Sequence, residues 1–409
     1  MTDNAERPYA AFRLNLEQQK KRAKERAKAA GVQLAKAQFD IATELGFASW
    51  AKLKQHIAAM DRERAAMEEA QGARDAQPRL DAGMRTLHLR CGSDIHKPLV
   101  EAGFKGDFLE HSYPYSQGPV REGPGALEQR ARFIVDGFGN FMQLDYEGQL
   151  VGAYNVERQL LDTANYERVV IWSEYDTWDQ LALLRFLDHY SRNPRPRVLE
   201  LINVQRFPGS LRFIGLGQLP PEALRLLWTE RRPTTPAQLA LGAKAWAALA
   251  SDDPRALAAI ASRPTPPLPL LGPALHRHLR QLPSVENGLS LTEHMILQLV
   301  SEAVRPMNRT FGLLIYHRDP LPSATDLLMR TIVINMRDES RCLLTRTQVG
   351  DMPGWNDTLE ITGLGREVLT GQVDWLSLNP PRRWVGGVEI GPGLRDWRWD
   401  EARREAAAL

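Results

Sequence analysis

The chain has 409 residues, 43% of them hydrophobic and 25% charged, which is the balance of an ordinary globular protein. Because one hydrophobic core rarely organises so many residues, we expect roughly two to four compact parts. The formal net charge of +2 excludes a general attraction of the whole molecule for polyanions. The two cysteines exclude a disulfide framework, and no Cys/His cluster has the spacing of a zinc site, so we assign no metal site and leave the cofactor unassigned.

The sequence contains neither a secretory signal nor a run of about 18 apolar residues that would cross a bilayer. Its sparse use of cysteine fits a reducing compartment. These features predict a cytoplasmic protein without a membrane partner.

Residues 1–60 predict a basic helical module. Residues 17–30 are strong helix formers rich in lysine and arginine, residues 34–45 carry apolar side chains at helical spacing, and Ser49 is placed to cap a third helix. Residues 1–57 contain 11 basic and 6 acidic side chains. A solvated helical surface explains this excess, and a nucleic-acid or protein partner is the alternative.

Residues 61–83 predict a helical extension that runs into a linker, and residues 84–216 a central α/β domain. Strand-like and helix-like segments alternate in this domain. The strand-like segments are 84–90, 106–113, 169–172 and 197–204, and the helix-like ones 95–102 and 177–190. This alternation predicts a mainly parallel, Rossmann-like sheet and places the chain in the α/β class.

Residues 217–285 predict helical connectors separated by prolines, and residues 286–409 a C-terminal α+β domain. Within the latter, Ser290 and Glu293 have the spacing of a capping box, and the β-branched run at 331–336 predicts a strand.

Residues 369–378 indicate a winged-helix-like character for this C-terminal part. Residues 286–409 nevertheless contain no lysine, and their 14 arginines face 17 acidic side chains. This balance has the wrong sign for neutralising phosphates, so DNA binding is disfavoured there.

The first candidate site lies between the strand at 84–90 and the following helix. Gly92 lets the backbone approach a ligand, and the helix N-terminus favours an anion, so Gly92 and Ser93 are assigned to ligand binding and Cys91 and Asp94 to catalysis. Alternatively, Ser93 or Asp94 caps the helix and Cys91 is a small buried hydrophobic side chain.

The second candidate site follows the strand at 169–172. Glu174 and Asp176 are assigned to catalysis, and Tyr175, Asp179 and Gln180 to ligand binding, because crowded carboxylates support general acid or base chemistry or position a divalent ion. Helix capping is the alternative, since Thr177 and Gln180 match a capping box.

If the strands that precede these two sites are neighbours, their side chains converge. His88 would then join the ligand-binding set, together with Tyr113, Ser116 and Gln117 from the end of the strand at 106–113 and the segment after it. Tyr115, in the same segment, could line the same pocket. A packed histidine in the strand and a tight turn at 117–119 are the structural alternatives.

Seven blocks of the sequence resemble the bacterial "domain of unknown function 1835" family with its companion C-terminal domain: 87–95, 102–110, 117–120, 172–181, 212–228, 288–299 and 383–400. The resemblance implies one unit from about residue 84 to residue 400, preceded by a small helical module. It implies no activity, as the family name states. Tyr113 and Ser116 stand where the family usually has aspartate and cysteine, and Tyr175 stands where it usually has histidine.

The sequence therefore predicts a protein that binds a small polar or anionic ligand at the carboxyl ends of the central parallel strands, as an enzyme or a degenerate enzyme. The alternative function is a nonenzymatic adaptor or regulator. It would bind protein or nucleic acid through the N-terminal basic helices and the C-terminal domain.

Overall fold

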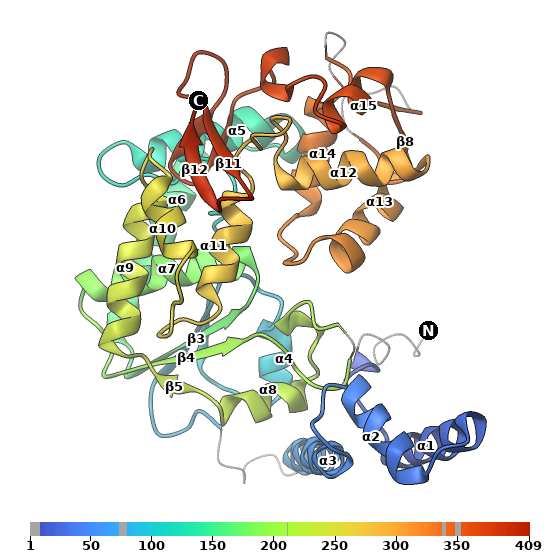
Figure 1. Cartoon of the computed structure of the whole chain (residues 1–409). Coiled ribbons are helices and arrows are strands. Elements are labelled where there is room, and N and C mark those ends of the chain that lie inside the picture. Colours follow the sequence, from blue (N-terminus) through green and yellow to red (C-terminus); the bar gives the residue numbers. More distant parts are fainter. Residues whose placement is uncertain (1–8, 73–79, 211, 338–340, 348–352) are drawn as a thin grey trace. The chain divides into compact units, whose positions relative to one another are not determined.

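The computed structural model describes residues 9–72, 80–210, 212–337, 341–347 and 353–409. The protein is mixed α/β (Figure 1), which confirms the predicted fold class. Its chain forms two compact units. The first unit comprises Met1–Ser112, Thr163–Glu174 and Pro194–Thr234, and the second comprises Tyr113–Asp162, Tyr175–Asn193 and Thr235–Leu409.

The first unit contains the central sheet. Its elements are α1 (Leu16–Ala30), α2 (Leu34–Glu44), α3 (Trp50–Gly72), β1 (Thr86–Arg90), α4 (His96–Glu101), β2 (Asp107–Glu110), η2 (Thr163–Asn165), β3 (Arg168–Glu174), β4 (Val198–Val204), η3 (Leu216–Gln218), α8 (Pro221–Trp228) and β5 (Arg232–Pro233). The strand order is β2-β1-β3-β4-β5, with parallel pairing except between β4 and β5.

The buried centre of this sheet follows directly from the sequence. The continuous apolar run of β3 is buried along almost its whole length, as expected for a strand covered on both faces. β2 lies at the edge and is partly exposed. β1 and β3 are neighbours, which is the condition on which the predicted convergence of the two candidate sites depended.

The N-terminal helices form a small core of their own. Its buried apolar side chains come from all three helices and their connections: Ala23, Ile41, Ala42, Leu45, Phe47, Leu53 and Ile57. The predicted cap at Ser49 is confirmed, because its hydroxyl accepts a hydrogen bond from the Lys52 amide. Arg13 and Arg64 both bind the fully buried carboxylate of Glu222 on α8, at 2.8 and 3.1 Å.

The second unit is mainly helical. Its elements are α5 (Ala126–Met142), α6 (Tyr146–Asp162), α7 (Thr177–Arg192), α9 (Pro236–Leu249), α10 (Arg255–Ala261), α11 (Leu271–Leu279), α12 (Leu291–Glu302), β6 (Arg305–Pro306), α13 (Met307–Leu313), η4 (Leu314–Arg318), α14 (Asp326–Asn335), β7 (Leu344–Arg346), β8 (Thr358–Ile361), α15 (Gly363–Leu369), η5 (Trp375–Leu378), β9 (Arg383–Val385), β10 (Val388–Ile390), β11 (Trp397–Asp400) and β12 (Glu405–Ala408). The capping box of Ser290 and Glu293 is present at the start of α12.

The strand predicted at 331–336 is wrong, because these residues belong to α14 and its C-cap. Met329, Ile332, Val333 and Met336 are buried at helical spacing, so tertiary packing selects the helix although the local run is β-branched.

The order of elements from α12 to β8 is that of a winged helix. The helix α12 and the short strand β6 are followed by α13, which continues into the π-helix η4, then by α14 and the antiparallel pair β7 and β8. The sheet order is β6-β8-β7. The sequence had suggested this character from residues 369–378, which instead form the end of α15 and the 3-10 helix η5. Within the described ranges, no helix is both long and apolar enough to cross a membrane.

Candidate functional site

The predicted ligand loop after β1 is held by an arginine. Arg90 is buried and donates from Nε and Nη2 to the two carboxylate oxygens of Asp94, at 2.6 and 2.8 Å. The predicted caps at Ser93 and Asp94 are wrong, because α4 has Ile95 at its N-cap position without a side-chain cap. Asp94 is instead the counterion of Arg90.

Glu174, at the end of β3, belongs to the same network. One of its oxygens lies 3.4 Å from Nη2 of Arg90, and its carboxylate accepts a hydrogen bond from the backbone amide of Leu216. A side chain at Gly215 would come within 2.7 Å of the Glu174 carboxylate, and one at Gly217 within 2.8 Å of the Asp94 carboxylate. The backbone of residues 215–217 therefore packs directly against the carboxylates of Glu174 and Asp94. The sequence did not predict that this segment belongs to the network.

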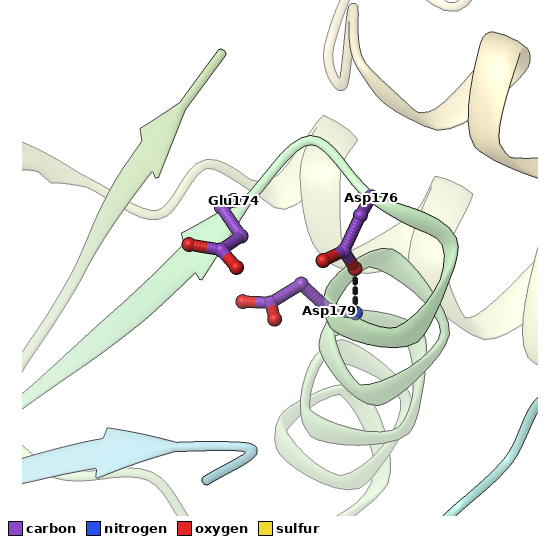
Figure 2. Close-up of side chains that lie close together, drawn as sticks. All are labelled: Glu174, Asp176 and Asp179. Carbon is purple, nitrogen blue, oxygen red and sulfur yellow. Dashed lines mark hydrogen bonds between the residues drawn. The ribbon is translucent and has the colours of Figure 1, made fainter. Parts of the chain in front are cut away.

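Figure 2 shows the three carboxylates predicted around the end of β3, all from one six-residue segment. Ligand oxygens of Glu174, Asp176 and Asp179 lie within 4.8 Å of one another, a spacing that can hold a divalent cation. All three of these groups already have partners within the protein. Asp176 caps α7 by accepting from the Asp179 amide at 2.8 Å, so the predicted capping box of Thr177 and Gln180 is wrong by one residue.

His88 is packed in the core, which is the structural alternative that the sequence offered for it. Nε2 of His88 lies 3.3 Å from Asp81, and Nδ1 of His88 accepts from the indole of Trp172 at 3.1 Å, so both ring nitrogens are used inside the core. Burial raises the pKa of Asp81, but hydrogen bonds from His88 and from the amides of Gly106 and Lys105 outweigh it and hold the pKa below its ordinary value. Cys91 is buried at the end of β1.

The second unit contains a large pocket, which we call the tyrosine pocket. Its volume is 660 Å³, and its lining includes Tyr113, Tyr115, Arg121, Glu122, Leu127, Arg130, Glu157, Arg185, Asp188, Arg192 and Trp246. Tyr113 and Tyr115 are the two of these that the sequence had proposed as pocket residues, while Ser116 and Gln117 lie on the same loop outside the lining. The Gln117 amide donates to Thr325 at 3.2 Å.

Helix packing gives the tyrosine pocket its shape. α7 packs against α9, where a side chain at Gly242 would meet Leu187 Cβ at 2.3 Å, so only glycine permits this approach. One turn beyond Gly242, Trp246 reaches the lining. The pocket loop packs on α5 in the same way: Gly118 has a φ of +74°, and a side chain there would meet the Phe133 ring at 2.4 Å.

Most charges around the tyrosine pocket are paired. Arg192 lies 2.8 Å from Asp188 and 3.3 Å from Glu122, and Arg185 pairs with Glu157. The three acidic side chains of the lining are therefore already engaged by two of its four arginines. Burial raises the pKa of Asp188 against the opposing effect of its arginine neighbours Arg192 and Arg185.

Arg130 stands apart from these pairs. It is 4% exposed and donates to the backbone carbonyls of Pro119 and Pro114 at 2.9 and 2.6 Å. Its guanidinium also lies 4.7 Å from the ring centre of Tyr113 and 5.7 Å from that of Tyr115. Among the described residues no carboxylate pairs with it, and burial lowers the pKa of its guanidinium.

The sequence offered little that could have located this pocket. The spacing of Arg185, Asp188 and Arg192 places all three on one face of a helix, which was readable, but their lining role depends on packing. α5 and α6, which supply Arg130 and Glu157, were not predicted at all.

The basic N-terminal surface is partly paired within the module itself. α1 carries six lysines and arginines, of which four form ion pairs with acids on α1 or α2: Lys20, Lys21, Arg22 and Arg26. The nucleic-acid or protein partner predicted for these helices stays a prediction.

Comparison with protein-family models found no family that matches the chain, and comparison with curated proteins found no match. The resemblance to the "domain of unknown function 1835" family therefore stays a prediction that rests on the seven sequence blocks.

Proposed function

We propose that the protein binds a small molecule carrying a carboxylate or phosphate group in the tyrosine pocket, with Arg130 as its main anchor. The observation that carries this proposal is the buried guanidinium of Arg130 at the pocket wall, which has no carboxylate partner among the described residues.

Electrostatics supports an anionic ligand. A buried cation is costly unless an opposite charge compensates it, and tyrosine rings and carbonyl dipoles supply only part of that compensation. The three nearby acids are held by Arg185 and Arg192. A ligand oxyanion beside Arg130 would therefore meet an uncompensated charge in a medium where Coulomb attraction is strong.

The pocket volume of 660 Å³ suits a small metabolite rather than a bare ion, since ligand pockets usually span about 300–1,000 Å³. The ligand class is the one predicted from the sequence, a small polar or anionic molecule. Its proposed place is different, because the acids after β1 and β3 are engaged by Arg90, by a backbone amide and by helix capping. Catalysis at Glu174, Asp176, Asp94 and Cys91 stays a prediction.

The test is a calorimetric titration of the full chain with two probes, citrate and glycerol 3-phosphate. Citrate binding alone would identify a carboxylate site, and glycerol 3-phosphate binding alone a phosphate site. Leu127→Trp adds bulk to the pocket lining while it leaves the arginine at position 130 in the chain, and it is expected to abolish binding. Saturable binding that survives in Leu127→Trp, or the absence of binding for both probes, would contradict the proposal.

A further inference from the structure

A second pocket in the same unit is lined by basic side chains and by no acidic ones. Its volume is 360 Å³, and it lies between the end of α10, the proline-rich segment after it, α11 and the turn that joins β11 to β12. We call it the arginine pocket. Its ionisable lining residues are Arg263, His276, Arg277, Arg280 and Arg404.

Only part of this positive charge is compensated. Arg277 forms a buried two-point pair with Asp319, at 2.9 and 2.8 Å, and Arg280 lies 3.2 Å from Glu401. In the part of the chain that the structure describes, Arg263 and Arg404 have no acidic partner. Two cations are therefore left uncompensated at the mouth of a pocket that contains no carboxylate in its lining.

The buried arginine supplies an independent sign of a ligand. Arg277 is 2% exposed, and its Nη1 atom is buried without a hydrogen-bond partner among the described residues. A buried charged donor left unsatisfied is rare, because it costs the desolvation energy of the group. Nε and Nη2 are used by Asp319 and Thr292, so Nη1 is the donor of Arg277 that has no partner in the described part of the chain. Because Nη1 is itself buried, a bound group would reach it only after a shift of the side chains around it.

The backbone adds to the attraction for anions. Gly272 and Pro273, in the first turn of α11, also line the arginine pocket. A helix N-terminus carries a partial positive charge. Pro273 has no backbone N–H and the Leu271 amide donates to Leu268, so the amide of Gly272 is the backbone group that could add to the side-chain charge.

We infer that the arginine pocket is a separate site for a phosphate-bearing ligand with at least two negative charges. Arginine binds phosphate oxygens through paired hydrogen bonds, and two uncompensated arginines match a diphosphate group better than a single carboxylate. This inference does not depend on the tyrosine pocket.

The test is a calorimetric titration of the full chain with pyrophosphate and, in a second series, with ADP. Arg263→Gln and Arg404→Gln each remove an exposed cation that no described acid pairs with, and each is expected to weaken pyrophosphate binding about tenfold. Arg403→Gln is the matched control, because Arg403 is exposed, lies next to Arg404 and pairs with Asp400 outside the pocket. It is expected to bind like the wild type.

The result that supports the inference is a loss of affinity in both pocket variants with no loss in the control. ADP binding with the same pattern would show that the site takes the diphosphate group of a larger molecule. No binding of pyrophosphate or ADP, or equal weakening in Arg403→Gln, would overturn it. Arg130→Gln distinguishes the arginine pocket from the tyrosine pocket. If pyrophosphate binding were lost in Arg130→Gln but kept in Arg263→Gln and Arg404→Gln, the ligand would bind in the tyrosine pocket, which would contradict the inference.

Discussion

Buried histidines are expected to make the protein lose stability in mild acid. His278, on α11, is 1% exposed, and neither ring nitrogen has a hydrogen-bond partner in the described part of the chain. Burial, followed by repulsion from Arg277, lowers the pKa of His278 from 6.5 to about 4. Folding therefore requires this imidazole to remain neutral.

The size of the effect follows from proton linkage. Between pH 6.5 and about 4 the unfolded chain holds a proton on His278 that the folded protein does not, so the free energy of unfolding falls as the pH is lowered through this window. The slope is about 1.4 kcal/mol per pH unit, and the full loss is about 3 kcal/mol. His189 adds a comparable loss, because burial, followed by the charge of Arg185, lowers its pKa to about 4.

The assay is urea unfolding of the wild type and of His278→Leu between about pH 7 and pH 4.5. Leucine removes the proton site without breaking a hydrogen bond, so the variant should show a pH slope shallower by about 1.4 kcal/mol per unit. His317→Leu, at an exposed position, should keep the wild-type slope. An unchanged slope in His278→Leu would refute the reasoning.

Two substitutions probe the packing and the charge network. Gly242→Ala places a methyl group 2.3 Å from Leu187 Cβ and should lower the free energy of unfolding by about 1–3 kcal/mol. The control is Gly152→Ala in α6, which has open space around it and should not lower the free energy of unfolding. Equal effects of the two substitutions in chemical denaturation would contradict the packing argument. Arg90→Leu removes the arginine that lies 3.4 Å from the buried Glu174 carboxylate and should cost about 3 kcal/mol of unfolding free energy. Glu174→Gln in the same chain should restore part of this loss, and a double variant no more stable than Arg90→Leu would argue against the pair.

Several elements could be read from the sequence because their signals are local. The apolar run of β3 predicted a covered strand, and the side-chain caps at Ser49 and Ser290 predicted helix starts that the structure confirms. Local sequence patterns were misleading where tertiary packing decides the secondary structure. The β-branched run at 331–336 favours a strand locally, and only burial at helical spacing along α14 decides otherwise.

The candidate sites show the same limit. The sequence placed carboxylates at the ends of β1 and β3, and the structure has them there. The sequence could not show that Arg90 pairs with Asp94 and Glu174. That pairing depends on strand order and on the turn at 215–217. Arg130 carries no sequence signal either, because its lack of an acidic partner is a property of the packed helices.

The comparison of Arg130→Gln with Arg132→Gln tests the proposed function most directly. The two arginines lie two residues apart on α5, but Arg132 is exposed, stacks on Tyr146 and lies outside the tyrosine pocket. The measurement is the affinity of each variant for citrate or glycerol 3-phosphate, whichever the wild type binds. We expect Arg130→Gln to lose affinity by about tenfold or more and Arg132→Gln to keep it. Full affinity in a folded Arg130→Gln variant would contradict the account.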